Sequence, residues 1–215
     1  MLIIGAKGFA KEVLEVFQQK KQLDSLFFYD DVNEDIDSML YGTFPVIKSV
    51  EEAQKLFSTI DDQFTIGIGN PFLRYKLYKK FEAIGGKFTS VISPFAHIGN
   101  FGTVVNEGSN IMTNAILTND VHVGKGSLIN LSCTVGHDVF MDDFVELCPD
   151  VNVSGNCKIG KFTFIGTNST ILPNIEIGTN VIVAAGSVVT KNIPDNCMVA
   201  GIPAVVKKEL TPLEF

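Results

Sequence analysis

A histidine stands directly before an aspartate in the segment TVGHDVFMDD, which runs from Thr134 to Asp143. The chain has three histidines, and this segment holds His137. An imidazole exchanges protons near neutral pH, so an exposed histidine can act as a general base in group transfer. Whether His137 is exposed depends on the regular pattern of the residues around it.

Aliphatic side chains recur at every sixth position of this region, from Val105 to Val189. All 15 positions of the series hold an aliphatic residue or methionine. A second series, four places further on in each hexapeptide, holds small or β-branched residues from Ser109 to Ser187. A strict period of six predicts a parallel β-helix, in which three hexapeptides close one triangular coil and the first series points inward.

His137 lies two residues after the inward Val135 of this register. Residues at the same place in other hexapeptides are mostly polar or turn-forming, including Glu107, Thr113, Asn119, Lys125, Asp143, Pro149 and Lys161. The pattern predicts an exposed corner for His137. Steps of eighteen then place Gly155, Pro173 and Lys191 above it, a climb of roughly 14 Å at the spacing of neighbouring strands.

The region before the repeats has a mixed α/β pattern. Short apolar runs predict strands, and amphipathic stretches predict helices, one of which begins with Asn70 as N-cap and Pro71 in its first turn. The expected strands cover 2–4, 26–30 and 64–68, and the expected helices cover 9–21, 50–57 and 71–84. We therefore predict a small parallel sheet domain over 1–90, a β-helix domain over 91–200 and a C-terminal tail over 201–215.

The amino-acid composition argues against some classes of binding partner. The formal net charge of −7 and the pI near 4.9 argue against nucleic acid or an anionic membrane as partner, because both require a basic surface. No run of about 18 apolar residues suggests a membrane span, and we expect a cytoplasmic protein. Arg74 is the single arginine, so it is a candidate phosphate ligand.

The four cysteines, Cys133, Cys148, Cys157 and Cys197, form no C-x-x-C pair and have no histidine at ligand spacing. We expect buried thiols and no metal site. Nothing near Cys148 in the sequence would activate it as an acyl-enzyme nucleophile.

Several motifs resemble one known family. The repeats VGKGSL, IGKFTF, IGTNSTILP and IGTNVIVAAGSVVTKNIPDN, the closing GIPA and the N-terminal IIGAKGFAKEV resemble hexapeptide-repeat acyltransferases of the bacterial sialic-acid O-acetyltransferase and nucleotide-aminosugar N-acetyltransferase group. The resemblance implies an α/β domain followed by a left-handed parallel β-helix. It also implies acetyl-CoA as donor, a sugar or nucleotide-sugar acceptor, and a homotrimer with active sites at subunit interfaces.

The same resemblance assigns roles to residues. His137 would be the general base, Asp138 would orient or stabilise it, Asn130 would contact the acceptor, and the Gly155 N–H would face the thioester carbonyl. The chain departs from the family in having Phe9 and Glu146 at positions where many members have histidine. Phe9 concerns the details of acceptor binding, and Glu146 removes a possible contact near the acetyl group. Neither departure affects His137.

Cofactor residues follow from the resemblance and the coil register together. The acetyl thioester would lie by His137 and Gly155, and the nucleotide end of acetyl-CoA would lie toward lysines near the end of the β-helix. The expected cofactor-binding residues are Gly155, Pro173, Ala185, Lys191 and Lys207.

Acceptor residues are expected in the N-terminal domain. A strand, a glycine turn and a helix can present backbone N–H groups to an anion, which the resemblance makes a nucleotide diphosphate. The turn is not a full G-x-G-x-x-G, so packing alone could also explain its glycines. The expected substrate-binding residues are Gly5, Lys7, Gly8, Phe9, Asp30, Gly69, Asn70 and Arg74.

We hypothesise acetyl transfer from acetyl-CoA to the 4-amino group of a nucleotide-linked deoxysugar. O-acetylation of a sialic-acid-type sugar is an alternative, and a non-catalytic sugar-nucleotide-binding protein is another. A metal-dependent β-helix enzyme fits less well, since the three histidines do not stack by eighteens. Large apolar residues at outward positions favour the trimer, namely Leu128, Phe140, Phe164 and Ile182.

Overall fold

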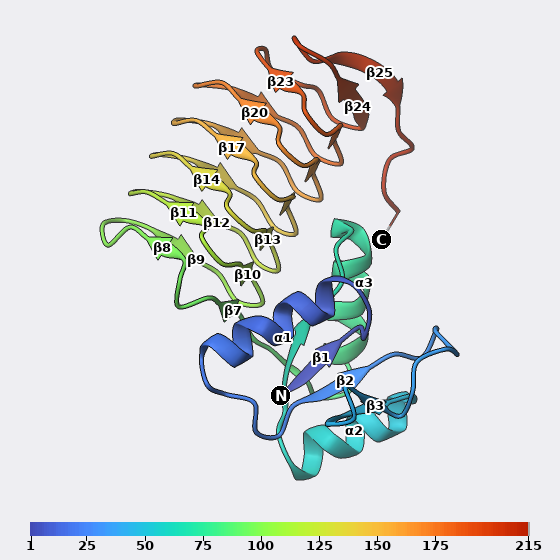
Figure 1. The fold of residues 1–215 in the computed structure, drawn as a ribbon. Coiled ribbons are helices and arrows are strands. Elements are labelled where there is room, and N and C mark those ends of the chain that lie inside the picture. The colour runs from blue at the N-terminus through green and yellow to red at the C-terminus, as the bar shows by residue number, and fades with distance from the viewer. Residues whose placement is uncertain (215) are drawn as a thin grey trace.

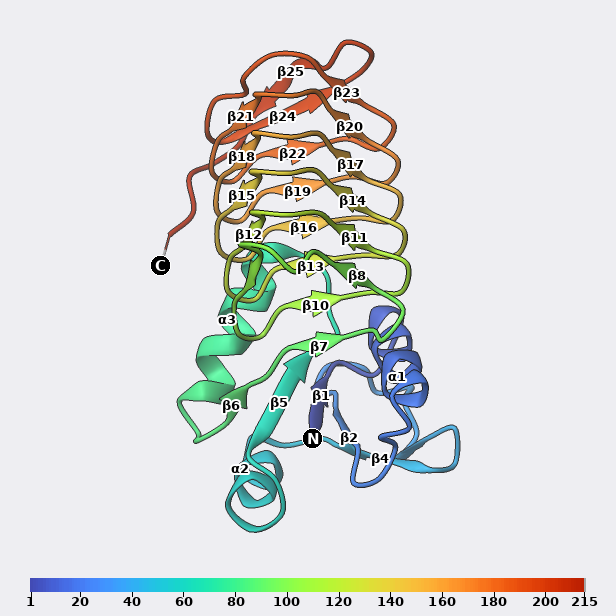
Figure 2. The same ribbon diagram turned by 90° about the vertical axis from the view of Figure 1, so that its left-hand side faces the viewer.

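The structure, a computed structural model, describes residues 1–214. An N-terminal α/β unit lies at one end of a column of stacked coils (Figure 1). The column is a left-handed parallel β-helix, and Figure 2 shows its coils one above another. This confirms the predicted fold class.

The N-terminal unit is built on one sheet with the strand order β3-β4-β2-β1-β5-β6. β1 lies inside the sheet and pairs in parallel with β2 on one side and β5 on the other. β3 and β4 form a hairpin that the sequence did not predict, because Pro45 within β4 argues against a strand. The strands are β1 (Leu2–Ile4), β2 (Phe27–Tyr29), β3 (Met39–Leu40), β4 (Phe44–Ile47), β5 (Gln63–Ile66) and β6 (Lys87–Phe88).

Three helices accompany this sheet: α1 (Phe9–Gln19), α2 (Val50–Thr59) and α3 (Pro71–Glu82). α1 has a strongly amphipathic sequence and buries one apolar face against the sheet and the first coils. Ser49 caps α2 by accepting a hydrogen bond from the Glu52 N–H, and Asn70 caps α3 by accepting one from the Leu73 N–H. The predicted N-cap at Asn70 is thereby confirmed.

The β-helix has three faces, each a parallel sheet of short strands. Face 1 contains β7 (Val91–Ile92), β10 (Asn110–Ile111), β13 (Leu128–Ile129), β16 (Glu146–Leu147), β19 (Phe164–Ile165), β22 (Ile182–Val183) and β24 (Cys197–Ala200), with β25 (Val205–Glu209) added antiparallel. Face 2 contains β8 (His97–Ile98), β11 (Ile116–Leu117), β14 (Thr134–Val135), β17 (Asn152–Val153), β20 (Thr170–Ile171) and β23 (Val188–Val189). Face 3 contains β9 (Val104–Val105), β12 (His122–Val123), β15 (Phe140–Met141), β18 (Lys158–Ile159) and β21 (Glu176–Ile177).

The chain visits the faces in the order 1, 2, 3, and we call the bends after them the first, second and third corners. Residues eighteen apart lie in register, as Thr134 pairs with Asn152 and Val135 with Val153. From Ile111 to Val189 every member of the first six-residue series is at most 3% exposed. The second series is at most 7% exposed throughout. Both inward columns are as the period predicts.

Two aromatic residues at the third corner attach α3 to the β-helix. Phe144 and Phe162 have left-handed backbone conformations, with φ of 53° and 60°, at positions where Asn or Gly is usual. Their rings stack at 5.9 Å, and the Phe144 ring meets Tyr75 of α3 edge-on at 5.5 Å. The packing of these rings holds a backbone conformation that bulky residues otherwise avoid.

Arg74 of α3 joins the two parts of the molecule from inside. Its side chain is fully buried, and its five N–H groups donate to oxygens on both sides of the junction. The acceptors are Ile66 O and Ile68 O in the N-terminal unit, and Gly126 O, Gly108 O and Asn110 Oδ1 in the β-helix. Burial lowers the pKa of Arg74 to about 10, while the nearby Glu146 acts in the opposite direction.

The tail after β25 returns along the outside of the coils toward α3 (Figure 2). The Leu210 N–H donates to Asn196 O at 2.8 Å, and Asn180 Nδ2 donates to Thr211 O at 3.1 Å. Leu213 packs against the aromatic cluster beside α3. In the part of the chain that the structure describes, no helix is long and apolar enough to span a membrane.

Candidate active site

His137 lies on the second corner, two residues after β14, and its side chain is 64% exposed. Its Nδ1 is 2.7 Å from Oδ2 of Asp138. This pairing fixes the ring orientation and leaves the Nε2 lone pair free to accept a proton. The imidazole is therefore oriented by Asp138 and accessible from solvent.

Gly155 occupies the same corner on the next coil, directly against the imidazole. A Cβ built on Gly155 would lie 2.7 Å from both Cε1 and Nε2 of His137. Only a glycine therefore leaves room for the ring in this position. The Gly155 N–H makes no hydrogen bond within residues 1–214, so it can donate to a ligand oxygen.

The second corner continues upward through Pro173 and Lys191, because β17, β20 and β23 are paired without a register shift. Both residues are exposed. Leu172 precedes Pro173 and leaves 38% of its surface exposed, which adds an apolar contact beside the column. Leu172 was not predicted as a site residue, although the register places it one step before a corner residue.

Asn130 and Ala185 lie on the first corner, so one whole strand of face 2 separates Asn130 from His137 within one chain. Asn130 is 8% exposed, and its Oδ1 accepts a hydrogen bond from the Leu131 N–H at 2.8 Å. Lys207 is exposed on β25, at the end of face 1. The residues expected to act together are thus divided between two edges of the β-helix.

A cavity of about 230 Å³ opens at the carboxyl ends of β1, β2 and β5. Gly5 and Asp30, two of the predicted substrate-binding residues, line it together with Ile68. Asp31 and Asn33 also line it and were not predicted as site residues. Asp30 is 7% exposed, and its Oδ1 accepts from the backbone N–H groups of Val32 and Asn33. Asp30 therefore shapes the loop that borders the cavity.

The glycine turn leads from this cavity to the start of α1. Gly8 is the N-cap of α1 with φ of 32°, and a Cβ built there would meet no atom within 4 Å. Lys7 Nζ pairs with Asp35 at 2.7 Å on the surface, and Phe9 is the first residue of the helix. At this helix N-terminus the Ala10 and Lys11 N–H groups donate to Lys7 O and Gly8 O, whereas the Gly8 and Phe9 N–H groups donate no hydrogen bond within residues 1–214.

The turn of Gly69 and Asn70 faces the β-helix at Glu146. A Cβ built on Gly69 would lie 2.9 Å from Glu146 Oε1. Glu146 is buried at 6% exposure, which its sequence position gave no sign of. Arg74 lies behind this turn with all five N–H groups bonded to protein oxygens, so it has no donor left for a phosphate and we remove it from the site.

Leu128 also differs from its predicted place. It is 1% exposed because α1 and the N-terminal sheet cover it, so it does not face another subunit. Phe140 remains 46% exposed on face 3, and Phe164 and Ile182 are half-buried on face 1.

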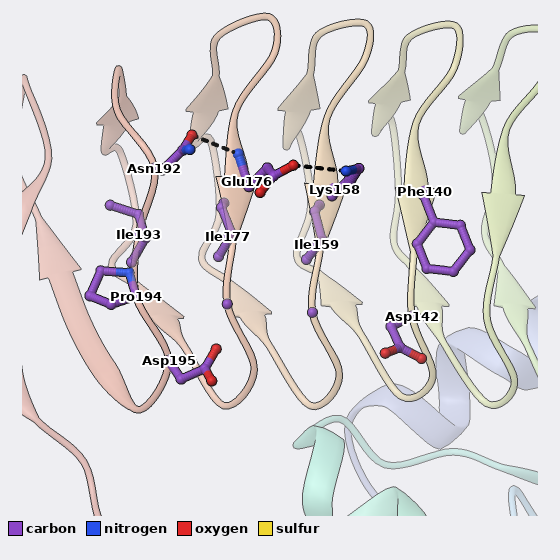
Figure 3. A pocket seen from close by; sticks show the side chains of 12 residues that line it. Phe140, Asp142, Lys158, Ile159, Glu176, Ile177, Asn192, Ile193, Pro194 and Asp195 are labelled. Atoms are coloured by element: carbon purple, nitrogen blue, oxygen red, sulfur yellow. Dashed lines mark hydrogen bonds and ion pairs between the residues drawn. The ribbon is translucent and has the colours of Figure 1, made fainter.

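A further cavity, about 610 Å³ in volume, lies on face 3 (Figure 3). Asp142 and Asp195 flank it, and an ion pair between Lys158 and Glu176 at 2.8 Å crosses its rim. None of the residues assigned to the site lines it. Within residues 1–214 no three His, Cys, Asp or Glu side chains are grouped as metal ligands would be.

Comparison with known proteins matches the two parts of the chain to two family models. Residues 1–81 match the PglD N-terminal domain, and residues 156–191 match the bacterial transferase hexapeptide of six repeats. WeeI from Acinetobacter baumannii AYE superposes with a TM-score of 0.86 and 30% identity, covering 96% of this chain and 98% of that one. The chain belongs to the hexapeptide-repeat acetyltransferases.

Two other similar proteins indicate which kinds of acetyl transfer occur among the relatives of this acetyltransferase. A mutant GDP-perosamine N-acetyltransferase from Caulobacter crescentus, solved with CoA and GDP-perosamine, has a TM-score of 0.88 and 26% identity over 97% of this chain and 96% of that one. A galactoside O-acetyltransferase of Lactococcus lactis is 29% identical over 176 residues, which are 77% of this chain and 81% of the relative. N- and O-acetyltransferases are therefore both similar to this hexapeptide-repeat acetyltransferase.

Proposed function

We propose that the enzyme transfers an acetyl group from acetyl-CoA to the 4-amino group of a nucleotide-linked amino-deoxysugar, with His137 as general base. The observation that carries the proposal is the exposed imidazole held between Asp138 and Gly155. The similar N-acetyltransferase that was solved with CoA and GDP-perosamine supports the choice of donor and acceptor.

The reaction is a direct acyl transfer. His137 Nε2 takes a proton from the acceptor amine while the nitrogen attacks the thioester carbonyl carbon. The Gly155 N–H donates a hydrogen bond to the oxygen as negative charge develops there. The C–S bond then breaks, the amide forms, and the proton passes from the imidazolium to the CoA thiolate. Asp138 keeps Nδ1 protonated and stabilises the imidazolium.

The division of the site between two corners leads us to propose a homotrimer with shared active sites. The second corner of one subunit, with His137, would face the first corner and the N-terminal unit of the next subunit, with Asn130 and the acceptor. Acetyl-CoA would lie between these edges, along Pro173 and Lys191 on one side and Ala185 on the other, with Lys207 near its nucleotide end. Molar mass in solution tests this, and a monomer would contradict it.

We place the nucleotide of the acceptor in the cavity beside β1. The strand order reverses at β1, since α1 leads to β2 on one side and α2 leads to β5 on the other. Ligands of open α/β sheets bind at such a point, outside the carboxyl ends of the strands. The diphosphate would meet the N–H groups at the start of α1, near Gly8, Lys7 and Phe9, and the base would lie toward Asp30 and the turn of Gly69 and Asn70.

Replacing His137 tests the mechanism. We expect His137→Ala to lower kcat by about 10²- to 10⁴-fold with the fold intact, because general-base catalysis contributes on that scale. His122→Ala is the matched control, since His122 stacks on Phe140 on face 3 at 4.6 Å and has no role in the mechanism. Wild-type turnover in His137→Ala would disprove the proposal.

O-acetylation of a sugar is the second candidate, favoured by the similarity to galactoside O-acetyltransferase. The same base and donor serve a hydroxyl nucleophile. A screen of nucleotide-aminosugars and hydroxyl sugars with acetyl-CoA, read as free thiol, separates the two. Ligand binding without thiol release would favour a non-catalytic sugar-nucleotide-binding protein.

We also propose a cytoplasmic location, because all four cysteines are free thiols.

A further inference from the structure

Glu146 has a carboxyl oxygen without a hydrogen-bond partner. It lies on β16 of face 1, is 6% exposed, and faces the N-terminal unit at Gly69. Within residues 1–214, Oε2 is the one buried side-chain polar atom found without a partner. Buried polar atoms are nearly always paired, so an unpaired carboxyl oxygen requires an explanation.

The groups packed against this carboxyl do not satisfy Oε2. Arg74 of α3 attracts it through charge, but its N–H groups are all bonded elsewhere. The Asn70 N–H, at the start of α3, and the thiol of Cys148, 3.9 Å from Oε1, also favour the charged form. Burial outweighs these contributions and raises the pKa of Glu146 above that of an ordinary glutamate.

The carboxyl lies on the acceptor side of the molecule. It packs against the backbone of Gly69, in the turn between β5 and α3. The same turn gives Ile68 to the cavity beside β1, and the first turn of α3 gives it Leu73. On the β-helix side, Asn130 lies one coil below Cys148, because Ile129 pairs with Leu147. The Gly69 turn therefore connects the wall of the cavity with the Glu146 carboxyl.

We propose that Glu146 is a positioning residue that selects amino acceptors, with its unpaired oxygen binding the ammonium form of the sugar amino group. The inference rests on the function proposed above, because it assumes that the acceptor sugar lies along the Gly69 turn. An orphaned carboxylate in a buried site gains a charged partner when the ammonium binds.

Charge is the basis of the selection. An ammonium offers three N–H donors and a positive charge, whereas a hydroxyl offers one donor and no charge. A hydrogen bond with one ionised partner is roughly twice as strong as a neutral one, and an ammonium paired with a carboxylate adds the attraction of opposite charges. The bound ammonium releases one proton to water before its nitrogen attacks, and His137 takes the second proton during transfer. Glu146 therefore acts in binding and not in the transfer step.

The experiment compares a nucleotide-linked 4-aminosugar with the same sugar carrying a 4-hydroxyl, in wild type, Glu146→Gln and Glu146→Asp. We expect Glu146→Gln to lower kcat/KM for the amino acceptor at least about tenfold, mainly through KM, because it removes a charge-assisted contact. The hydroxyl acceptor should lose less than the amino acceptor, because Glu146→Gln weakens one hydrogen bond to it but removes no ion pair. Glu146→Asp should restore part of the amino preference.

The pH dependence of KM for the amino acceptor distinguishes a binding role of Glu146 from a purely structural one. As pH falls through the raised pKa of Glu146, the carboxyl becomes neutral, so the wild-type KM for the amino acceptor should rise. This rise should begin at a higher pH than for an exposed glutamate, and it should be absent in Glu146→Gln. Glu176→Gln is the matched control, because Glu176 is an exposed, ion-paired glutamate at the equivalent strand position of face 3.

Equal ratios of amino to hydroxyl activity in wild type and a folded Glu146→Gln variant would overturn the inference. A wild-type enzyme that acetylates neither acceptor would instead overturn the proposed function. In that case binding of the two nucleotide sugars, measured by calorimetry, tests Glu146 alone. Equal affinity of wild type and Glu146→Gln for the aminosugar would then refute its role.

Discussion

The imidazole of His137 occupies the space into which a side chain at Gly155 would project. The two residues are eighteen apart, one coil of the β-helix, and the strands before them pair without a shift. The glycine thus does two things: it admits the ring and it presents an N–H beside it. One backbone register therefore places the proposed base beside the proposed oxyanion donor.

A methyl group at position 155 should displace the ring. We expect Gly155→Ala to lower kcat by about 10²-fold, the loss typical of a base misplaced by roughly 1 Å. The Gly155 backbone φ is in the ordinary negative range, so the fold should persist. In a His137→Ala background the second change should cost little, because its effect passes through the ring. Additive losses in the double variant would contradict this coupling.

Asp138 should matter through the orientation of His137. Asp138→Asn is the suitable change, because residue 138 has φ of 58° and asparagine tolerates that conformation. We expect kcat to fall about tenfold, less than for a buried triad aspartate, since this pair is exposed and screened by solvent. The KM for acetyl-CoA should stay unchanged in steady-state assays, and a large change in KM alone would indicate a binding role instead.

Arg74 should govern stability. Arg74→Met would leave five oxygens without their donor and should lower the free energy of unfolding by roughly 3–5 kcal/mol, the usual cost of breaking a buried charged network. Urea denaturation measures this loss. Lys76→Met on the exposed side of α3 is the control, with an expected effect within about 1 kcal/mol, because it loses only an exposed cation–π contact with Phe72. A similarly small effect at Arg74 would contradict its role as the link between the two parts.

Cys148 should be dispensable for chemistry. Burial, followed by the nearby Glu146 charge, raises the pKa of the Cys148 thiol to about 12, so almost no thiolate exists at neutral pH. Cys148→Ala should keep kcat within about threefold of wild type, since a direct transfer uses no thiol nucleophile. Native protein should also resist iodoacetamide at this residue, as read by mass spectrometry. An acetylated Cys148 trapped with acetyl-CoA would contradict the direct mechanism.

Local patterns predicted much of the fold. The six-residue period gave both inward columns, because every coil repeats the same environment at each position. The N-cap at Asn70 and the strand Leu2–Ile4 were likewise readable from a few neighbouring residues. The exposed place of His137 followed from the same period. The hairpin of β3 and β4 was not predicted, because its strands are only 2 and 4 residues long and β4 contains a proline.

Local sequence patterns did not predict the contacts between segments that are distant in the sequence. Leu128 and Glu146 hold outward positions in the repeat, and the period alone predicts that they face solvent or another subunit. The N-terminal unit covers both, through α1 and the Gly69 turn. Arg74 was a candidate phosphate ligand for its charge, yet its partners lie up to 52 residues away in sequence.

The sequence by itself determined the β-helix, its eighteen-residue register and the stacking of His137 beneath Gly155. These features depend on a pattern of inward and outward residues that is present within each hexapeptide. Only the tertiary structure decided which outward residues the N-terminal unit buries, that Arg74 is committed to protein oxygens, and that Glu146 keeps an unpaired carboxyl oxygen. Those outcomes depend on how two separately patterned regions dock. Docking is set by shape and hydrogen bonding across the junction, which no single segment encodes.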